Sequence, residues 1–95
     1  MTIAAVFQFP GATVDQYEKV FKIGGAAINN QSSRLSHVCF ATPEGVTVID
    51  VWADEASFAK FGAVIGPATE QAGLVGGPSI YPAQGFMAAD GVRNP

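Results

Sequence analysis

Two apolar runs separated by four turn-forming residues constrain this chain more than any other feature. The runs Leu35 to Ala41 and Val46 to Trp52 flank Thr42-Pro43-Glu44-Gly45. Proline suits the first corner of a type I turn, and glycine suits the left-handed position that follows it. The pattern therefore predicts an antiparallel hairpin with a three-residue loop and a glycine bulge.

This loop also predicts which side chains share a face of the hairpin. Counting back from it sets Thr42 opposite Val46 and Val38 opposite Asp50. Because side chains alternate along a strand, His37 is then expected on the sheet face opposite Asp50. Both faces of the hairpin are mostly apolar.

The segments before the hairpin predict a strand and a helix. The apolar run Ile3 to Phe9, closed by Pro10-Gly11, is typical of a strand followed by a turn. Thr13 with Gln16 three positions later resembles a capping box. Apolar residues recur at helical spacing from Val14 to Ile28, although the glycine pair inside that range weakens a helix.

The segments after the hairpin predict a second helix and a last strand. Asp54 is a good helix cap, Pro67 is expected to interrupt the helix and open a second short one, and Gly73 is expected to end it. A strand is expected from Ser79 to Met87. Residues 88–95 lack periodicity and are expected to form a loose tail or an arm over a partner.

The resulting order, β-α-β-β-α-β, predicts an α+β ferredoxin-like domain over residues 1–95, with a four-stranded antiparallel sheet and helices on one face. The opposite sheet face would be uncovered. Hydrophobic residues make up 48% of the 95 and charged residues only 14%. Burial of that face in a homodimer, as a dimeric α/β barrel, is the simplest expectation.

Composition also excludes several classes of partner. The net charge is −3 and no Lys/Arg cluster occurs, so no nucleic-acid partner is expected. One cysteine, Cys39, and one histidine provide neither a disulfide nor a zinc ligand set.

The N-terminus has no basic segment, and its apolar run is too short for a signal peptide or membrane span. A cytoplasmic protein without membrane contact is expected.

Two residues are candidates for proton transfer. His37 has the only side chain with an ordinary pKa near neutrality, which suits general acid or base catalysis, although a structural role is the alternative. Asp50 lies in an otherwise apolar strand and must find a hydrogen-bond partner there. It either carries part of the chemistry or ends at the sheet margin or across the dimer.

Four further residues are candidates for contact with a substrate. Trp52 offers a large ring and one N–H donor, suiting either the core or a flat aromatic ligand. Three polar or semi-polar groups stand in apolar segments and could line one pocket with it: Gln8, Tyr17 and Tyr81. The glycines match no phosphate-binding pattern, so neither a nucleotide cofactor nor a metal is expected.

The segment Ile49 to Phe61, which contains Asp50-Val51-Trp52 followed by a capped helix, resembles the strand-to-helix signature of the dimeric α/β-barrel superfamily. Together with the element order, this resemblance covers nearly the whole chain. Gly66-Pro67-Ala68 through Ala72-Gly73-Leu74 is similar to small uncharacterised bacterial members. The nearest named group is the antibiotic-biosynthesis monooxygenase-like family.

The resemblance implies several possible functions. The family includes cofactor-independent quinone-forming monooxygenases, haem-degrading enzymes and members of unknown role. In the haem-degrading branch a histidine on the helix after the tryptophan ligates iron; here that position is Phe61, so haem degradation is not expected. Trp52 matches the family's tryptophan, and Gln8 lies near that branch's asparagine.

Two hypotheses follow. In the first, the protein is a cofactor-independent monooxygenase-like enzyme for an aromatic or polyketide-like compound. Trp52 would then pack against the ring, Gln8 or Tyr17 would hold a phenolic oxygen, and His37 or Asp50 would move a proton. In the second, it is a non-enzymatic small-molecule-binding or structural homodimer.

Overall fold

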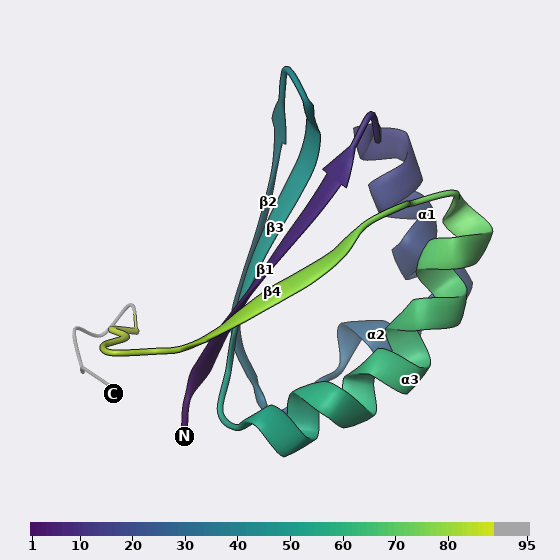
Figure 1. Ribbon diagram of the computed structural model, residues 1–95. Helices are drawn as coiled ribbons and strands as arrows, with labels where there is room; N and C mark the ends of the chain where they lie inside the picture. Colours follow the sequence, from purple (N-terminus) through teal and green to yellow (C-terminus); the bar gives the residue numbers. More distant parts are fainter. Residues whose placement is uncertain (89–95) are drawn as a thin grey trace.

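The computed structural model describes residues 1–88 and has the expected order of elements, with one helix divided in two. The four strands form an antiparallel sheet in the order β2-β3-β1-β4, and the helices lie together on one side of it (Figure 1). The predicted ferredoxin-like α+β fold is confirmed. The elements are β1 (Ile3–Pro10), α1 (Val14–Gly24), α2 (Ala26–Asn29), β2 (Arg34–Thr42), β3 (Gly45–Trp52), α3 (Glu55–Ala72) and β4 (Gly77–Pro82).

The first helix begins as predicted but ends earlier. Thr13 and Gln16 form the complete capping box. α1 stops at Gly24 because Gly25 adopts φ 56° and ψ −135°, a conformation outside the helix that glycine tolerates. The buried side chain of Ile28 packs directly onto Gly24, where a Cβ would collide with it. The glycine pair thus turns the chain into the four-residue α2.

The second long helix is continuous through its proline. Asp54 caps it, accepting a 2.7 Å hydrogen bond from the Ser57 backbone N–H, and the helix runs past Pro67 instead of restarting there. It ends before Gly73 as predicted, and this glycine takes a left-handed conformation with φ 81°. None of the helices described over residues 1–88 is long and apolar enough to cross a membrane.

The β2–β3 hairpin differs from the prediction by one residue of register. Its loop contains only Pro43 and Glu44, so Thr42 pairs with Gly45 instead of facing Val46. A shift of one residue exchanges the two faces of a strand. His37 consequently lies directly opposite Asp50, and the expectation that they occupy opposite faces was wrong.

A bulge near the start of β2 interrupts the alternation of its side chains between the two sheet faces. Arg34 pairs with Trp52 and Ser36 pairs with Val51, which leaves Leu35 as an extra residue between them. Such a bulge re-aims the side chain that precedes it. Arg34 and His37, three positions apart, therefore lie on the same sheet face, toward the helices.

The core lies between the sheet and the helices. From β1 and β3 alternate side chains point into it, and α3 contributes Phe58 and Phe61. We call the other side of the sheet the open face. It carries Ala4, Val6, Gln8, Val38, Phe40, Thr47, Ile49 and Val51.

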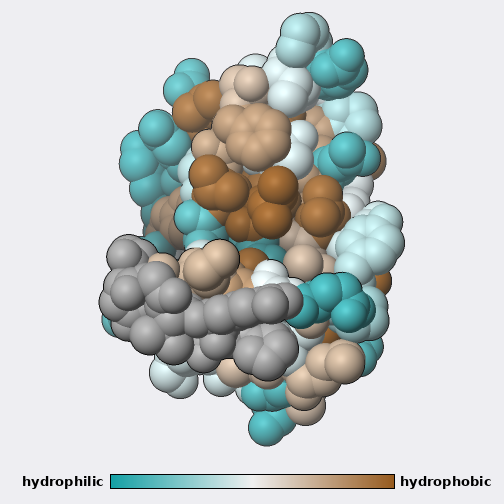
Figure 2. Space-filling model, turned by 90° about the vertical axis from the view of Figure 1, so that its left-hand side faces the viewer, coloured by the Kyte–Doolittle hydropathy of each residue, from teal (hydrophilic) through white to brown (hydrophobic). Residues whose placement is uncertain are grey.

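Hydrophobic residues gather across the centre of the open face (Figure 2). Val38 and Phe40 are 51% and 43% exposed there. This position also corrects the predicted faces, since Val38 was expected opposite Asp50, on the same face of the sheet. The last strand, β4, starts and ends earlier than the expected Ser79 to Met87. The expected tail or arm over 88–95 lies, apart from Ala88, outside the described residues.

We predict opposite effects of alanine at two glycines of this fold. Gly45 has φ 149°, and a Cβ there would collide with the carbonyl oxygen of Phe9. Gly45→Ala should therefore lower the free energy of unfolding by about 1–3 kcal/mol. Gly62→Ala, in the middle of α3 with open space around it, should raise it by up to about 1 kcal/mol. Urea unfolding of both variants measures this; a stable Gly45→Ala protein would contradict the observed β1–β3 approach.

Candidate active site

A chain of hydrogen bonds joins four side chains from three elements. Tyr17 of α1 lies with its hydroxyl oxygen 2.6 Å from Nε2 of His37 on β2. Nδ1 of His37 is 2.5 Å from Oδ1 of Asp50 on β3. The indole Nε1 of Trp52 donates to Oδ2 of the same carboxylate at 3.2 Å. These bonds run from the buried Trp52 on β3, through the edge strand β2, to the half-buried Tyr17 on α1.

The direction of these bonds follows from the group that can only donate. Indole N–H is never an acceptor, so Asp50 accepts from Trp52. With Asp50 as a carboxylate, its second oxygen accepts from Nδ1–H of His37. When the imidazole is neutral, Nε2 is an acceptor and the Tyr17 hydroxyl donates to it. A basic nitrogen is thereby held ready to take the tyrosine proton.

Tyr17 remains protonated over the physiological range. Burial is the main cause that raises the pKa of Tyr17 to about 12; the nearby Cys39 and Asp50 add to the rise, and Arg34 opposes it. Burial also raises the pKa of the Cys39 thiol, against a hydrogen bond with Tyr17. Cys39 is half-buried against the core. The tyrosine is thus a donor and relay in this site rather than a resting phenolate.

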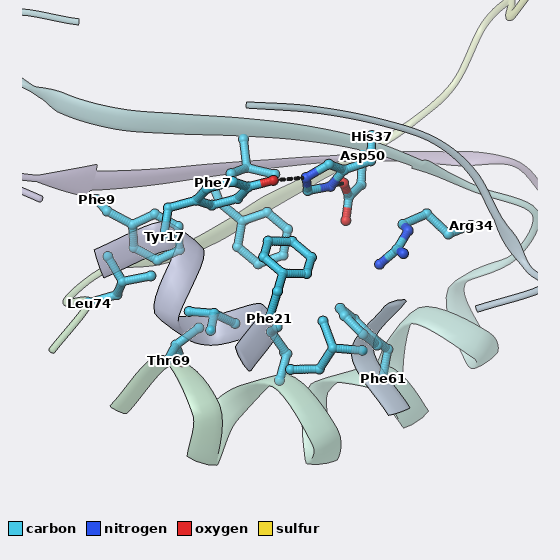
Figure 3. Close-up of a pocket in the computed structure, with 14 residues that line it drawn as sticks. Phe7, Phe9, Tyr17, Phe21, Arg34, His37, Asp50, Phe61, Thr69 and Leu74 are labelled. Atoms are coloured by element: carbon cyan, nitrogen blue, oxygen red, sulfur yellow. Dashed lines mark hydrogen bonds and ion pairs between the residues drawn. The ribbon is translucent and has the colours of Figure 1, made fainter. Parts of the chain in front are cut away.

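The chain borders a largely apolar cavity between the sheet and the helix layer (Figure 3). The cavity has a volume of about 40 Å³, and the space between its walls measures about 420 Å³ when the part open to solvent is included. The lining residues are Phe7, Phe9, Tyr17, Val20, Phe21, Ile28, Arg34, His37, Val48, Asp50, Phe61, Ile65, Thr69 and Leu74.

Arg34 is the member of this site that the sequence did not predict. Its guanidinium lies 5.7 Å from the centre of the Phe61 ring, and Nη2 donates to the Asn29 carbonyl at 3.1 Å. On plain alternation Arg34 would face away from His37, so only the bulge at Leu35 brings it to the cavity. No sequence signal for that bulge was evident.

The predicted site residues fall into two groups. Tyr17, His37, Asp50 and Trp52 come together as described. Trp52 is fully buried against Phe58 and Phe61 and does not line the cavity, so it contacts the site through Asp50.

The remaining two predicted site residues do not reach the cavity. Gln8 is exposed on the open face, between the inward-facing Phe7 and Phe9. Tyr81 pairs with Ala4 on that same face and is 57% exposed. No cluster of three or more His, Cys, Asp or Glu side chains suited to a metal ion occurs in the described part of the chain.

The fold and the cavity define the chain as a ferredoxin-like α+β protein with a site between sheet and helices. No protein-family model matches the sequence, and neither does any curated protein. Similar folds do occur among solved structures.

SnoaB from Streptomyces nogalater, a cofactor-independent oxygenase, aligns with a TM-score of 0.60 at 20% identity over 87% of this chain and 91% of its own. A conserved protein from Methanosarcina mazei Go1 aligns with a TM-score of 0.62 at 14% identity over 85% of this chain and 91% of its own. A candidate monooxygenase from Shewanella loihica PV-4 aligns at 0.57 and 18% identity over 86% and 90% of the two chains. The expected resemblance is confirmed at the level of the fold.

We predict an alkaline loss of stability that depends on Tyr17. Its pKa is raised from 10.0 to about 12 in the folded protein, so the folded state holds this proton more tightly than the unfolded chain. The contribution is complete below pH 10 and is lost as the pH rises toward about 12. The phenolate absorbance that wild type gains and Tyr17→Phe lacks should appear as the pH approaches about 12. The free energy of unfolding should fall less steeply with rising pH in the variant than in wild type. A Tyr17 titration at the ordinary tyrosine value would contradict the burial of its hydroxyl.

Proposed function

We propose that this protein is a cofactor-independent monooxygenase-like enzyme that oxidises an aromatic compound bearing an acidic O–H or C–H group. The observation that carries the proposal is the placement of His37. One ring nitrogen is oriented by the buried Asp50, and the other accepts from Tyr17 at the wall of an apolar cavity. A neutral histidine held in one tautomer by a carboxylate is a suitable general base near neutral pH.

The chemistry needs only this base and molecular oxygen. For an activated methylene, the base removes one C–H proton and leaves a ring-stabilised carbanion. The carbanion reduces O₂ and combines with it, and the hydroperoxide formed after reprotonation loses water to leave a carbonyl. In balance, one CH₂ group and one O₂ give one C=O group and one water, and the base regains its starting state.

Tyr17 is well placed to relay the proton. Its hydroxyl occupies the position in front of His37 Nε2 that a substrate hydroxyl would otherwise take. The substrate proton can pass to the Tyr17 oxygen while the tyrosine proton passes to Nε2, so neither side chain has to leave its place. Trp52 acts behind this pair, because its N–H holds the far oxygen of Asp50.

The comparisons support the proposal as likeness of fold. SnoaB is described as a cofactor-independent oxygenase, and its fold aligns over most of both chains. The Shewanella protein, also similar in fold, is a candidate monooxygenase. Since a fold hosts many functions, the weight rests on the His37 geometry.

A non-enzymatic small-molecule-binding or structural homodimer is the second candidate. It is favoured by the small volume of the cavity, about 40 Å³, and by the fact that both nitrogens of His37 already have partners. Turnover with oxygen separates the two candidates.

We expect oxygen-dependent turnover that requires His37. Wild type should consume O₂ with one or more members of a panel of one- and two-ring aromatic quinols and aromatic ketones with an activated methylene group, and product from ¹⁸O₂ should carry one labelled atom when such a ketone is used. His37→Gln should lower kcat by about 10²–10⁴-fold, the usual contribution of a general base. Glu18→Gln, an exposed change beside Tyr17 in sequence, is the control and should keep wild-type kcat. Binding of panel members without any oxygen uptake would favour the second candidate instead.

We also expect a homodimer formed through the open face. Val38 and Phe40 expose apolar surface there, and a stable pair should bury roughly 1,200–2,000 Å² in total. Val38→Asp should therefore give a monomer in sedimentation at micromolar concentration. Val75→Asp introduces the same charge at a valine that is 77% exposed before β4 and should leave the dimer intact. A wild-type monomer would remove the barrel hypothesis.

A further inference from the structure

A positive charge lines the apolar cavity without an ion-pair partner among residues 1–88. Arg34 is the single Lys or Arg in the cavity wall. Among those residues, the contact within 4.0 Å between a basic and an acidic side chain joins His37 to Asp50, and none of their carboxylates lies within 4.0 Å of the guanidinium. The Asp50 oxygens bond to His37 and Trp52 instead. Within the described part of the chain, the charge of Arg34 is therefore not neutralised by a protein carboxylate.

The guanidinium is held in place but largely unsatisfied. It lies against the face of Phe61, and of its five N–H groups one bonds, from Nη2 to the carbonyl of Asn29. Stacking and this bond restrict a side chain that would otherwise lose much rotamer entropy on binding. The remaining donors have the fork geometry that fits a carboxylate or phenolate in two parallel bonds.

The position of Arg34 relative to His37 restricts the ligand further. The bulge at Leu35 sets the two side chains on the same face of β2, and Figure 3 shows the guanidinium turned toward the side of the cavity where His37 and Asp50 lie. Phenylalanine rings form much of the remaining wall. A flat apolar body with an anionic group at one edge matches this wall.

The size of the cavity limits that body to a small ring system. A closed cavity of about 150 Å³ accommodates a benzene ring. On the same measure this cavity holds only about 40 Å³, so a ring cannot lie wholly inside it and part of the ligand must project through its open side. The His37 side chain is 26% exposed and Arg34 is half-buried, so both border this open side.

We propose that Arg34 recognises the anionic group of a small aromatic acid, with one or two rings, whose ring enters between the phenylalanines. The assignment of an anionic group to this site is argued from Arg34 alone and does not depend on turnover. The further assignment, that an acidic hydroxyl on the same ring meets Tyr17 and His37, rests on the proposed function.

Binding without oxygen tests the proposal separately from turnover. Hydroxybenzoates and hydroxynaphthoates, each compared with its methyl ester, are titrated into the protein by calorimetry under anaerobic conditions. Wild type should bind at least one acid about tenfold or more tightly than its ester, the scale of a charge-assisted hydrogen bond. Arg34→Gln should reduce that preference to about one while ester affinity changes little.

Two variants keep the test decisive. Arg34→Lys retains the charge without the fork and should keep part of the preference, which also covers the case in which Arg34→Gln is poorly folded. Lys22→Gln removes the same charge from an exposed site on α1 and should leave the preference unchanged.

Equal affinity for every acid and its ester, absence of binding by every acid, or a preference that survives in Arg34→Gln would each overturn the proposal. A preserved acid preference without oxygen uptake would remove the enzymatic function and leave the anion site. Oxygen uptake with no acid preference would support the enzymatic function and remove the anion site.

Discussion

The buried carboxylate of Asp50 is the interaction on which the rest of this structure depends. Its residue is 2% exposed, in a strand whose other inward-facing side chains are apolar. A charge in that position is costly unless hydrogen bonds and a partner replace the lost water. Trp52 donates one hydrogen bond to Asp50, and His37 forms the other. The carboxylate of Asp50 therefore orients both the tryptophan at the end of its strand and the histidine on the neighbouring strand.

Much of the fold could be predicted because its signals are local. The capping box at Thr13, the cap at Asp54 and the stop at Gly73 each depend on residues within one turn of the helix. The hairpin was also predictable from its turn residues. Its register was not, because Thr42-Pro43-Glu44-Gly45 suits a two-residue and a three-residue loop, and the difference of one residue exchanges every side chain between faces.

A non-local condition would have selected the correct register. Asp50 needs a partner in a mostly apolar sheet, and the chain has one histidine, on the neighbouring strand. Of the two registers, the observed one places His37 opposite Asp50, so that each side chain has the other as a hydrogen-bond partner. The place of Arg34 in the site could not be predicted in this way. It depends on the bulge at Leu35, which no feature of the sequence indicates. Gln8 and Tyr81 were misplaced in the site because a polar residue in an apolar strand indicates either a pocket or an exposed face.

The cavity and the open face are consequences of the same register. If β2 slipped by one residue, Val38 and Phe40 would turn toward the helices and His37 would turn to the open face. Asp50 would then lose its partner, at a cost of about 3–5 kcal/mol for a broken buried pair, and the open face would gain a histidine. The apolar residues of β2 alone do not resist such a slip, because they fit either side of the sheet. The His37–Asp50 pair does resist it, so the group that carries the proposed chemistry also keeps the apolar surface of β2 on the side where a second copy of the chain can cover it.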